Sequence, residues 1–221
     1  MKLVSEAQVR EALGFEDMTD ITLAIRTILP AVTASLEVAL DTSFELSTAQ
    51  EDFYVPPHKG PDVNGHMEIK LRLNNGFIAP GTCVVTSGMT SQSLVTEPIS
   101  IQTMTFRSYK DIEKGVLFDN RTFYAGTTRR LASIDYLAGP YIRVAYTYGF
   151  DVEEGDPELY DQARVPQWLK DAAIIQSQMF LSGHPILKNA ESVPDTDYLT
   201  KALRALLLSH QRFVPGSLIP M

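Results

Sequence analysis

The chain has 221 residues, 44% of them hydrophobic and 21% charged, values that are typical of a globular protein with a sizeable core and that exclude global disorder. Its formal net charge is -8, with no basic cluster beyond Arg129 and Arg130, which argues against a protein that grips nucleic-acid phosphates. The single cysteine, Cys83, excludes an internal disulfide and a thiolate-rich metal site, so we expect a reducing compartment.

Two helices are predicted at the start of the chain. Ser5 and Gln8 form a capping-box pattern and Gly14 is a stop signal, which together predict a short helix from about Glu6 to Leu13. Thr19 is placed to cap a longer helix, whose apolar residues recur three and four apart as far as Leu40.

The second helix contains Arg26, Pro30 and Glu37. These residues interrupt its apolar character, so we expect no membrane span, and Pro30 is expected to kink the helix. A helix-turn-helix that reads DNA is a possible alternative for the two helices, but its recognition surface would be nearly free of Lys and Arg.

The period of the sequence changes between Phe44 and Tyr148. Short β-type runs alternate there with Pro/Gly/Asn turns, and alternation is clearest from Met67 to Leu73. This pattern predicts a small antiparallel sandwich or barrel-like region between helical ends. The predicted strands are 53–55, 67–73, 83–85, 100–104, 116–118, 122–124 and 141–148.

The stretch from Tyr141 to Ser182 is the junction around which the chain is organised. Apolar residues, Tyr146 and Tyr148 among them, alternate with more polar ones along a strand that ends in a turn at Gly149, and an acidic loop follows. Pro166 is tolerated in the first turn of a helix, so a third helix is predicted to begin there. Trp168, the only tryptophan, and Leu169 lie in that turn, where Trp168 is expected to pack internally and position the helix.

A last amphipathic helix is predicted around Tyr198 to Leu207, capped by Asp195 or Thr196. The tail that follows is apolar but too interrupted by proline to extend the helix. Such a tail either marks an interaction site or folds back onto its own domain. Its apolar candidates are Phe213, Val214, Pro215, Leu218, Ile219 and Met221.

Signals for chemistry are sparse, and we predict no catalytic residues, no bound metal and no cofactor. His58, Asp62 and His66 are spaced four apart, but Gly60-Pro61 and Asn64-Gly65 forbid the helix that would align them as ligands. The acidic residues 151–156 offer oxygen ligands for a hard cation, although such a charge run is more often a solvated loop. Ser87, Ser91 and Ser93 have no histidine near them in the sequence.

The fold class predicted from these elements is α+β. A helical bundle is built from the N- and C-terminal helices, and an antiparallel β region is inserted between them. The expected divisions are 1–43 for the N-terminal helices, 44–150 for the β-rich region, 151–212 for the C-terminal helices and 213–221 for the apolar tail.

The N-terminal pair of helices and the junction together resemble the head-tail adaptor, or connector, proteins of long-tailed bacteriophages. The likeness is carried by Val144-Ala145-Tyr146-Thr147-Tyr148-Gly149-Phe150 and by Val165-Pro166-Gln167-Trp168-Leu169-Lys170. Proteins of that family often end a strand with tyrosine-threonine-any-glycine-aromatic and open the third helix with valine-proline. The likeness covers about half of the chain, and the central β region is larger than in the smallest members.

The resemblance implies a structural protein without enzymatic activity. It implies a homo-oligomeric ring, usually a dodecamer, that binds the portal protein of the capsid above and a stopper or tail completion protein below. Genomic DNA would pass through its channel without specific recognition. Its location would be the virion neck, reached from the host cytoplasm, and the apolar tail would contact the portal.

Two other functions remain open at this stage. In one, the β region is a carbohydrate- or receptor-binding module of a phage structural protein, flanked by oligomerising helices. In the other, the chain is a hydrolase whose site is assembled from distant residues. Measuring the mass of the protein by itself and in the presence of portal would distinguish the ring protein from these two. Glycan binding would favour the binding module, and substrate turnover would favour the hydrolase.

Overall fold

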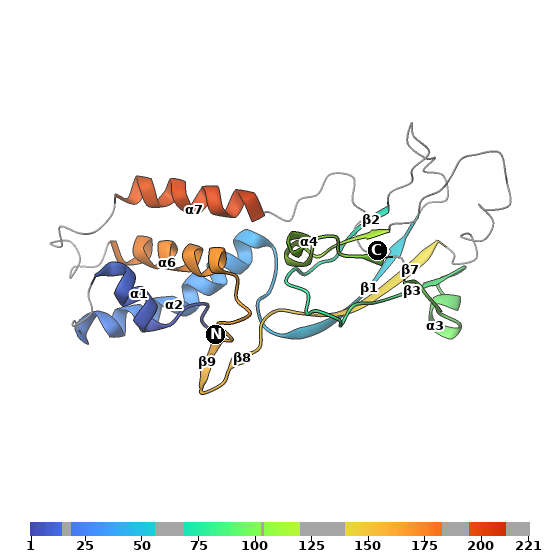
Figure 1. The fold of residues 1–221 in the computed structure, drawn as a ribbon, viewed down its shortest axis with the longest axis horizontal. Helices are drawn as coiled ribbons and strands as arrows, with labels where there is room; N and C mark the ends of the chain where they lie inside the picture. Colours follow the sequence, from blue (N-terminus) through green and yellow to red (C-terminus); the bar gives the residue numbers. More distant parts are fainter. Residues whose placement is uncertain (15–18, 56–68, 103, 120–139, 183–194, 211–221) are drawn as a thin grey trace. The chain divides into compact units, whose positions relative to one another are not determined.

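The computed structural model describes residues 1–14, 19–55, 69–102, 104–119, 140–182 and 195–210. The chain forms two compact units: a helical unit of residues 1–45 and 150–210, and a β unit of residues 46–149 (Figure 1). The predicted α+β class is confirmed, because N- and C-terminal helices pack together and antiparallel sheets lie between them along the chain.

Four helices make up most of the helical unit. They are α1 (Glu6–Leu13), α2 (Thr19–Leu40), α6 (Gln167–Ser182) and α7 (Thr196–His210). Helix α6 contacts each of the other three, and α2 also contacts α1 and α7. Helix α6 is therefore the one around which the N-terminal and C-terminal halves of this unit assemble.

Local signals set both ends of α1 and the start of α7 as the sequence predicted, whereas Thr19, predicted to cap α2, is the first residue of that helix. The Ser5 hydroxyl accepts a hydrogen bond from the Gln8 amide at 3.2 Å, and the Gln8 side chain accepts one from the Ser5 amide at 2.8 Å. Gly14 follows in the left-handed conformation with φ +71°. Asp195 caps α7, because its carboxylate accepts a hydrogen bond from the Asp197 amide at 3.1 Å. A capping box and an aspartate cap are both typical ways to satisfy free amides at helix starts. Of the two predicted caps for α7, the structure therefore identifies Asp195.

The acidic segment after β7 differs from its prediction, because it is a hairpin and not a loop. Strands β8 (Val152–Glu153) and β9 (Asp156–Tyr160) pair antiparallel around Gly155, whose φ is +95°. The start of the chain adds a further bridge, with the Lys2 amide donating to the Glu158 carbonyl at 2.9 Å. Backbone pairing to a distant segment therefore orders a stretch whose own side chains are mostly charged.

The described residues of the β unit form two antiparallel sheets. The first has the order β1 (Ser47–Tyr54), β7 (Tyr141–Tyr148), β3 (Val84–Gly88) and β4 (Ile99–Ser100). The second has the order β2 (Ile69–Arg72), β6 (Val116–Asp119) and β5 (Met104–Thr105). Two short helices, α3 (Ser93–Thr96) and α4 (Tyr109–Lys114), were not predicted.

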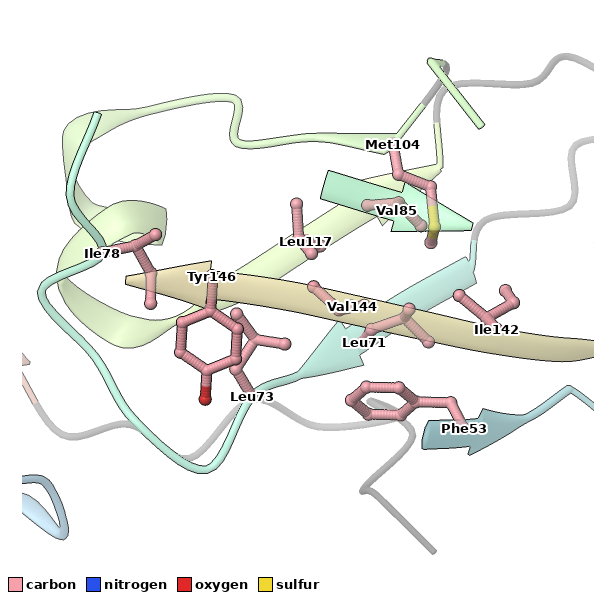
Figure 2. Close-up of a cluster of buried hydrophobic side chains, with 10 residues drawn as sticks. All are labelled: Phe53, Leu71, Leu73, Ile78, Val85, Met104, Leu117, Ile142, Val144 and Tyr146. Carbon is pink, nitrogen blue, oxygen red and sulfur yellow. The ribbon is translucent and has the colours of Figure 1, made fainter. Parts of the chain in front are cut away.

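Both sheets contribute side chains to one core (Figure 2). On β7, Ile142, Val144 and Tyr146 are buried and alternate with half-buried residues, which confirms the predicted strand with one buried face. The buried members of the core are Phe53, Leu71, Leu73, Ile78, Val85, Met104, Leu117, Ile142, Val144 and Tyr146.

Two strand predictions in this unit need correction. The run predicted as one strand over 100–104 is divided between the two sheets, because Ile99–Ser100 pairs with β3 whereas Met104–Thr105 pairs with β6. The strand predicted at 53–55 begins earlier, at Ser47, because the whole of β1 pairs with β7. The strand predicted at 122–124 lies outside the described residues.

Candidate functional site

The sequence predicts a turn at Gly149 after β7, and the structure shows the conformation of the chain there. Gly149 has φ +87°, in the left-handed region that favours glycine, and its amide donates to the Phe77 carbonyl at 3.0 Å. Tyr148 is half-buried, and its ring centroid lies 5.9 Å from that of the buried Tyr146. These residues end the strand and fix its direction.

Tyr146 takes part in a buried polar cluster. Its hydroxyl donates to the carboxylate of Glu51, which is only 7% exposed, and accepts a hydrogen bond from the Asn75 amide at 3.3 Å. Both carboxylate oxygens of Glu51 accept from the Asn74 amide, at 2.9 and 3.0 Å. Burial, followed by the bond to Glu51, raises the pKa of Tyr146 well above its ordinary value. The cluster thus fastens the turn after β2 to strands β1 and β7.

The helix side of the junction begins where the sequence predicted. The carbonyl of Pro166 accepts hydrogen bonds from the amides of Leu169 and Lys170, at 3.0 and 3.2 Å, so Pro166 opens the first turn of α6. Leu169 is fully buried in the helical unit. Trp168 is half-buried, and its ring stacks on His210 at the end of α7, with centroids 3.7 Å apart. This contact between the start of α6 and the end of α7 was not foreseen.

An aromatic cluster lies on the first residues after the turn. The Phe150 amide donates to the Phe44 carbonyl at 2.8 Å, and the Phe150 ring lies 5.9 Å from the rings of both Phe44 and Tyr160. The Glu37 carboxylate accepts from the Phe44 amide at 2.7 Å, just beyond α2. Burial, with smaller contributions from Glu37 and Glu45, raises the pKa of the Tyr160 hydroxyl. The cluster joins the end of α2 to the β8–β9 hairpin.

A group of ion pairs fastens the start of the chain to the same unit. The Lys2 ammonium, in a residue only 7% exposed, lies 2.7 Å from the Glu158 carboxylate and 3.4 Å from that of Glu6. Arg26 donates to Glu6 at 2.8 Å, and this hydrogen bond is the largest cause of the lowered pKa of Glu6. Burial opposes the charge on Lys2, but its hydrogen bonds to Glu158 and Glu6 outweigh burial and raise its pKa.

One arc of the exposed surface of α2 carries no charge, and the exposed Arg26 lies beside it. Leu23 and Val38 are 70% and 83% exposed, and the exposed residues between them that fall within one arc of the helix are small or apolar. Among the described residues, Ile21–Leu40 is the one segment long and apolar enough to cross a membrane, and 33% of that window is buried inside the unit. The exposed stripe consists of Leu23, Thr27, Pro30, Ala31, Ala34 and Val38.

Residues considered for chemistry do not converge in the described part of the chain. No three His, Cys, Asp or Glu side chains gather there in a way that could hold a metal. Ser87 is fully buried, Ser93 bonds to Thr90 within its own turn, and the described histidine, His210, stacks on Trp168 in the other unit. Burial raises the pKa of the Cys83 thiol to about 11.

Some predicted site residues lie outside the described residues. These are the histidines and the aspartate weighed as metal ligands and the whole apolar tail, so the portal contact remains a prediction. They are His58, Asp62, His66, Phe213, Val214, Pro215, Leu218, Ile219 and Met221.

No family model and no curated protein matches the sequence. Among solved structures, the chain is similar to one from the neck of an empty GTA particle computed with C6 symmetry, with a TM-score of 0.42 and 12% identity. The similarity covers 96% of this chain and 92% of that chain. No residue role is transferred across so distant a likeness.

Proposed function

We propose that the chain is a structural subunit of the neck of a phage-like particle. As a head-tail adaptor it forms a homo-oligomeric ring, a dodecamer, between the portal above and the stopper or tail completion protein below, and it leaves a channel for DNA. In this proposal the protein has no enzymatic activity and no cofactor.

The observation that carries the proposal is the junction. The adaptor-like residues lie at the ends of two elements: β7 ends at Gly149 in the left-handed conformation, and α6 opens at Pro166 and packs against both N-terminal helices. A short capped helix, a long helix and a proline-opened helix are the elements that the sequence resemblance requires, and here they form one packed unit. The resemblance thus falls on a strand end and on a helix start, which supports the proposal.

The surface of the helical unit supports an assembling protein. Leu23 and Val38 on α2, and Tyr198 on α7, are each more than two-thirds exposed. Large exposed apolar side chains along helix faces are typical of protein contact surfaces. The net charge of -8 also suits a channel through which DNA slides without being held.

Binding to portal-bearing capsids tests the proposal. The full chain should sediment with capsids that contain portal and not with capsids that lack it, and the mass of bound protein should correspond to a ring. A variant without residues 213–221 should lose this binding if the tail is the portal anchor. Binding that is independent of portal would contradict the adaptor role, whereas full binding by the truncated variant would contradict only the role of the tail.

A further inference from the structure

Helix α7 has an outward face that is both apolar and basic. Leu199 and Leu203 are buried against the helical unit, whereas Tyr198 and Leu208 are 68% and 53% exposed. Lys201 lies between them on the exposed side. Arg204 is exposed beside this stripe. The exposed Asp197 lies on the same side of the helix, so the face carries two cations and one carboxylate flanked by apolar side chains, and none of the three charged groups forms an ion pair with the described residues.

The β8–β9 hairpin has the opposite character. Asp151, Glu154 and Asp156 are exposed, and their described hydrogen bonds are local ones to backbone amides. Val152, which is 47% exposed, lies among them. The hairpin contains no Lys or Arg, so its exposed carboxylates have no neutralising partner on the same element.

The two surfaces lie on opposite sides of the same compact unit. In Figure 1, α7 runs along one edge of the helical unit and the hairpin projects from the other, with α1, α2 and α6 between them. Within one copy the other helices therefore separate them. Every copy nevertheless carries both.

We propose that the outward face of α7 in one copy docks against the β8–β9 hairpin of the next copy. Lys201 and Arg204 then face Glu154 and Asp156, and Tyr198 and Leu208 pack around Val152. Charge complementarity selects a second copy as the occupant, because the basic and the acidic face are present in equal number on identical chains. A contact between two different faces is head-to-tail, so it repeats from copy to copy and closes into a ring when its rotation allows.

This contact adds detail to the proposed function. The closed ring as its final form rests on that function. It identifies the lateral contact of that ring. Two cations are too few to hold a DNA duplex by phosphate contacts, since specific and non-specific binding both need many such contacts. An acidic surface on the portal is the other partner that the α7 face would fit, and the test separates the two.

Charge exchange is the sharpest test. Reversing both cations, Lys201→Glu with Arg204→Glu, should weaken self-association of the full chain by about a hundredfold, because like charges then face each other. Reversing the hairpin, Glu154→Lys with Asp156→Lys, should do the same. The four changes together should restore self-association to within a few-fold of the original, as measured by sedimentation velocity over a range of protein concentrations. Because all four residues are exposed, unfolding midpoints should change little, with the largest change expected from Asp156→Lys, which also removes the hydrogen bond from the Glu158 amide.

Covalent trapping gives an independent readout. In a Cys83→Ser background, a chain that carries both Lys201→Cys and Glu154→Cys should form disulfides between copies on oxidation, giving a ladder of covalent dimers, trimers and larger species. Each single cysteine variant should form no such ladder. A ladder that stops at the dimer would indicate a symmetric contact and overturn the proposal. Failure of the fourfold charge exchange to restore self-association, or a wild-type chain that stays monomeric at every concentration and forms no ladder, would also overturn it.

The outcomes for this contact and for the adaptor role are separable. Self-association that charge reversal abolishes and the fourfold exchange restores, in a chain that does not bind portal-bearing capsids, would support the contact and refute the adaptor role. Rings that still form on those capsids from charge-reversed chains would support the adaptor role and refute the contact.

Discussion

The interactions that stabilise the helical unit differ from those that stabilise the β unit. The helical unit is built from helices whose ends are set by neighbouring residues, as at Ser5 and Asp195, and it exposes long apolar faces. The β unit depends on a few contacts between distant segments, such as Glu51 with Tyr146 and the close approach of Gly115 to Asn75. We conclude that the β unit is more sensitive to single substitutions, whereas the helical unit is the more open to partners.

The largest expected effect is that of Gly115→Ala in the β unit. Gly115 has φ +63°, and a Cβ there would lie 2.1 Å from the backbone oxygen of Asn75. Strain and a backbone clash together should cost about 4 kcal/mol or more in unfolding free energy, measured by denaturant titration.

Gly81 is the matched control for this change. It has φ +75° in the same unit, but no atom lies within 4 Å of the position of an added Cβ. Gly81→Ala should therefore cost only the left-handed strain, about 1 kcal/mol. Equal losses from the two variants would show that the approach of Asn75 to Gly115 does not pin the β unit.

The next effect compares two neighbours at the start of α6. Leu169 is fully buried, so Leu169→Ala should lower the free energy of unfolding by about 3 kcal/mol. Trp168 is half-buried and stacked on His210, so Trp168→Ala should lower it by about 2 kcal/mol. Thermal unfolding followed by circular dichroism measures both variants. Wild-type stability of Trp168→Ala would contradict its role in positioning α6 and α7.

A smaller effect is expected from Tyr146→Phe. The change removes one hydrogen bond from the buried Glu51 carboxylate and should cost about 1.5 kcal/mol. Tyr148→Phe serves as the control, because no hydrogen bond of its hydroxyl occurs among the described residues, and it should change stability by less than about 0.5 kcal/mol. Denaturant midpoints compare the pair, and a larger loss from Tyr148→Phe would contradict the cluster.

The smallest effect concerns pH in the helical unit. The pKa of Glu6 lies below its ordinary value of 4.5 in the folded chain, chiefly because Arg26 hydrogen-bonds to it. A carboxyl with a lowered folded pKa contributes stability above pH 4.5, and that contribution is lost as the pH falls further through the folded pKa. The fluorescence of Trp168 reports on this unit, and its unfolding midpoint should fall less steeply with acid in Glu6→Gln than in the wild type.

The helical unit could be largely predicted because its signals are local. The capping box at Ser5, the cap at Asp195 and the proline at the start of α6 each specify a helix end within a few residues. The alternation along β7 was equally readable. Helix α4 carries a similar signal that was overlooked: Ser108 caps it by accepting from the Asp111 amide, and Gly115 ends it.

The remaining elements depend on distant partners and could not be predicted in this way. The first half of β1 is polar and becomes a strand only because it pairs with β7. The hairpin at Gly155 resembles a solvated acidic loop until the backbone of Lys2 bridges to β9. The bond between Glu51 and Tyr146 joins residues 95 positions apart. For the candidate site, the strand end and the helix start were readable, whereas the stacking of Trp168 on His210 and the charged faces of the helical unit required the fold.

The most direct test of the central claim, that this chain is a structural neck subunit, is electron microscopy of assembled particles in which the chain carries a bulky label. We predict labelled density arranged as a ring at the vertex where the capsid meets the tail. Particles that are complete but carry no label at that vertex would contradict the account.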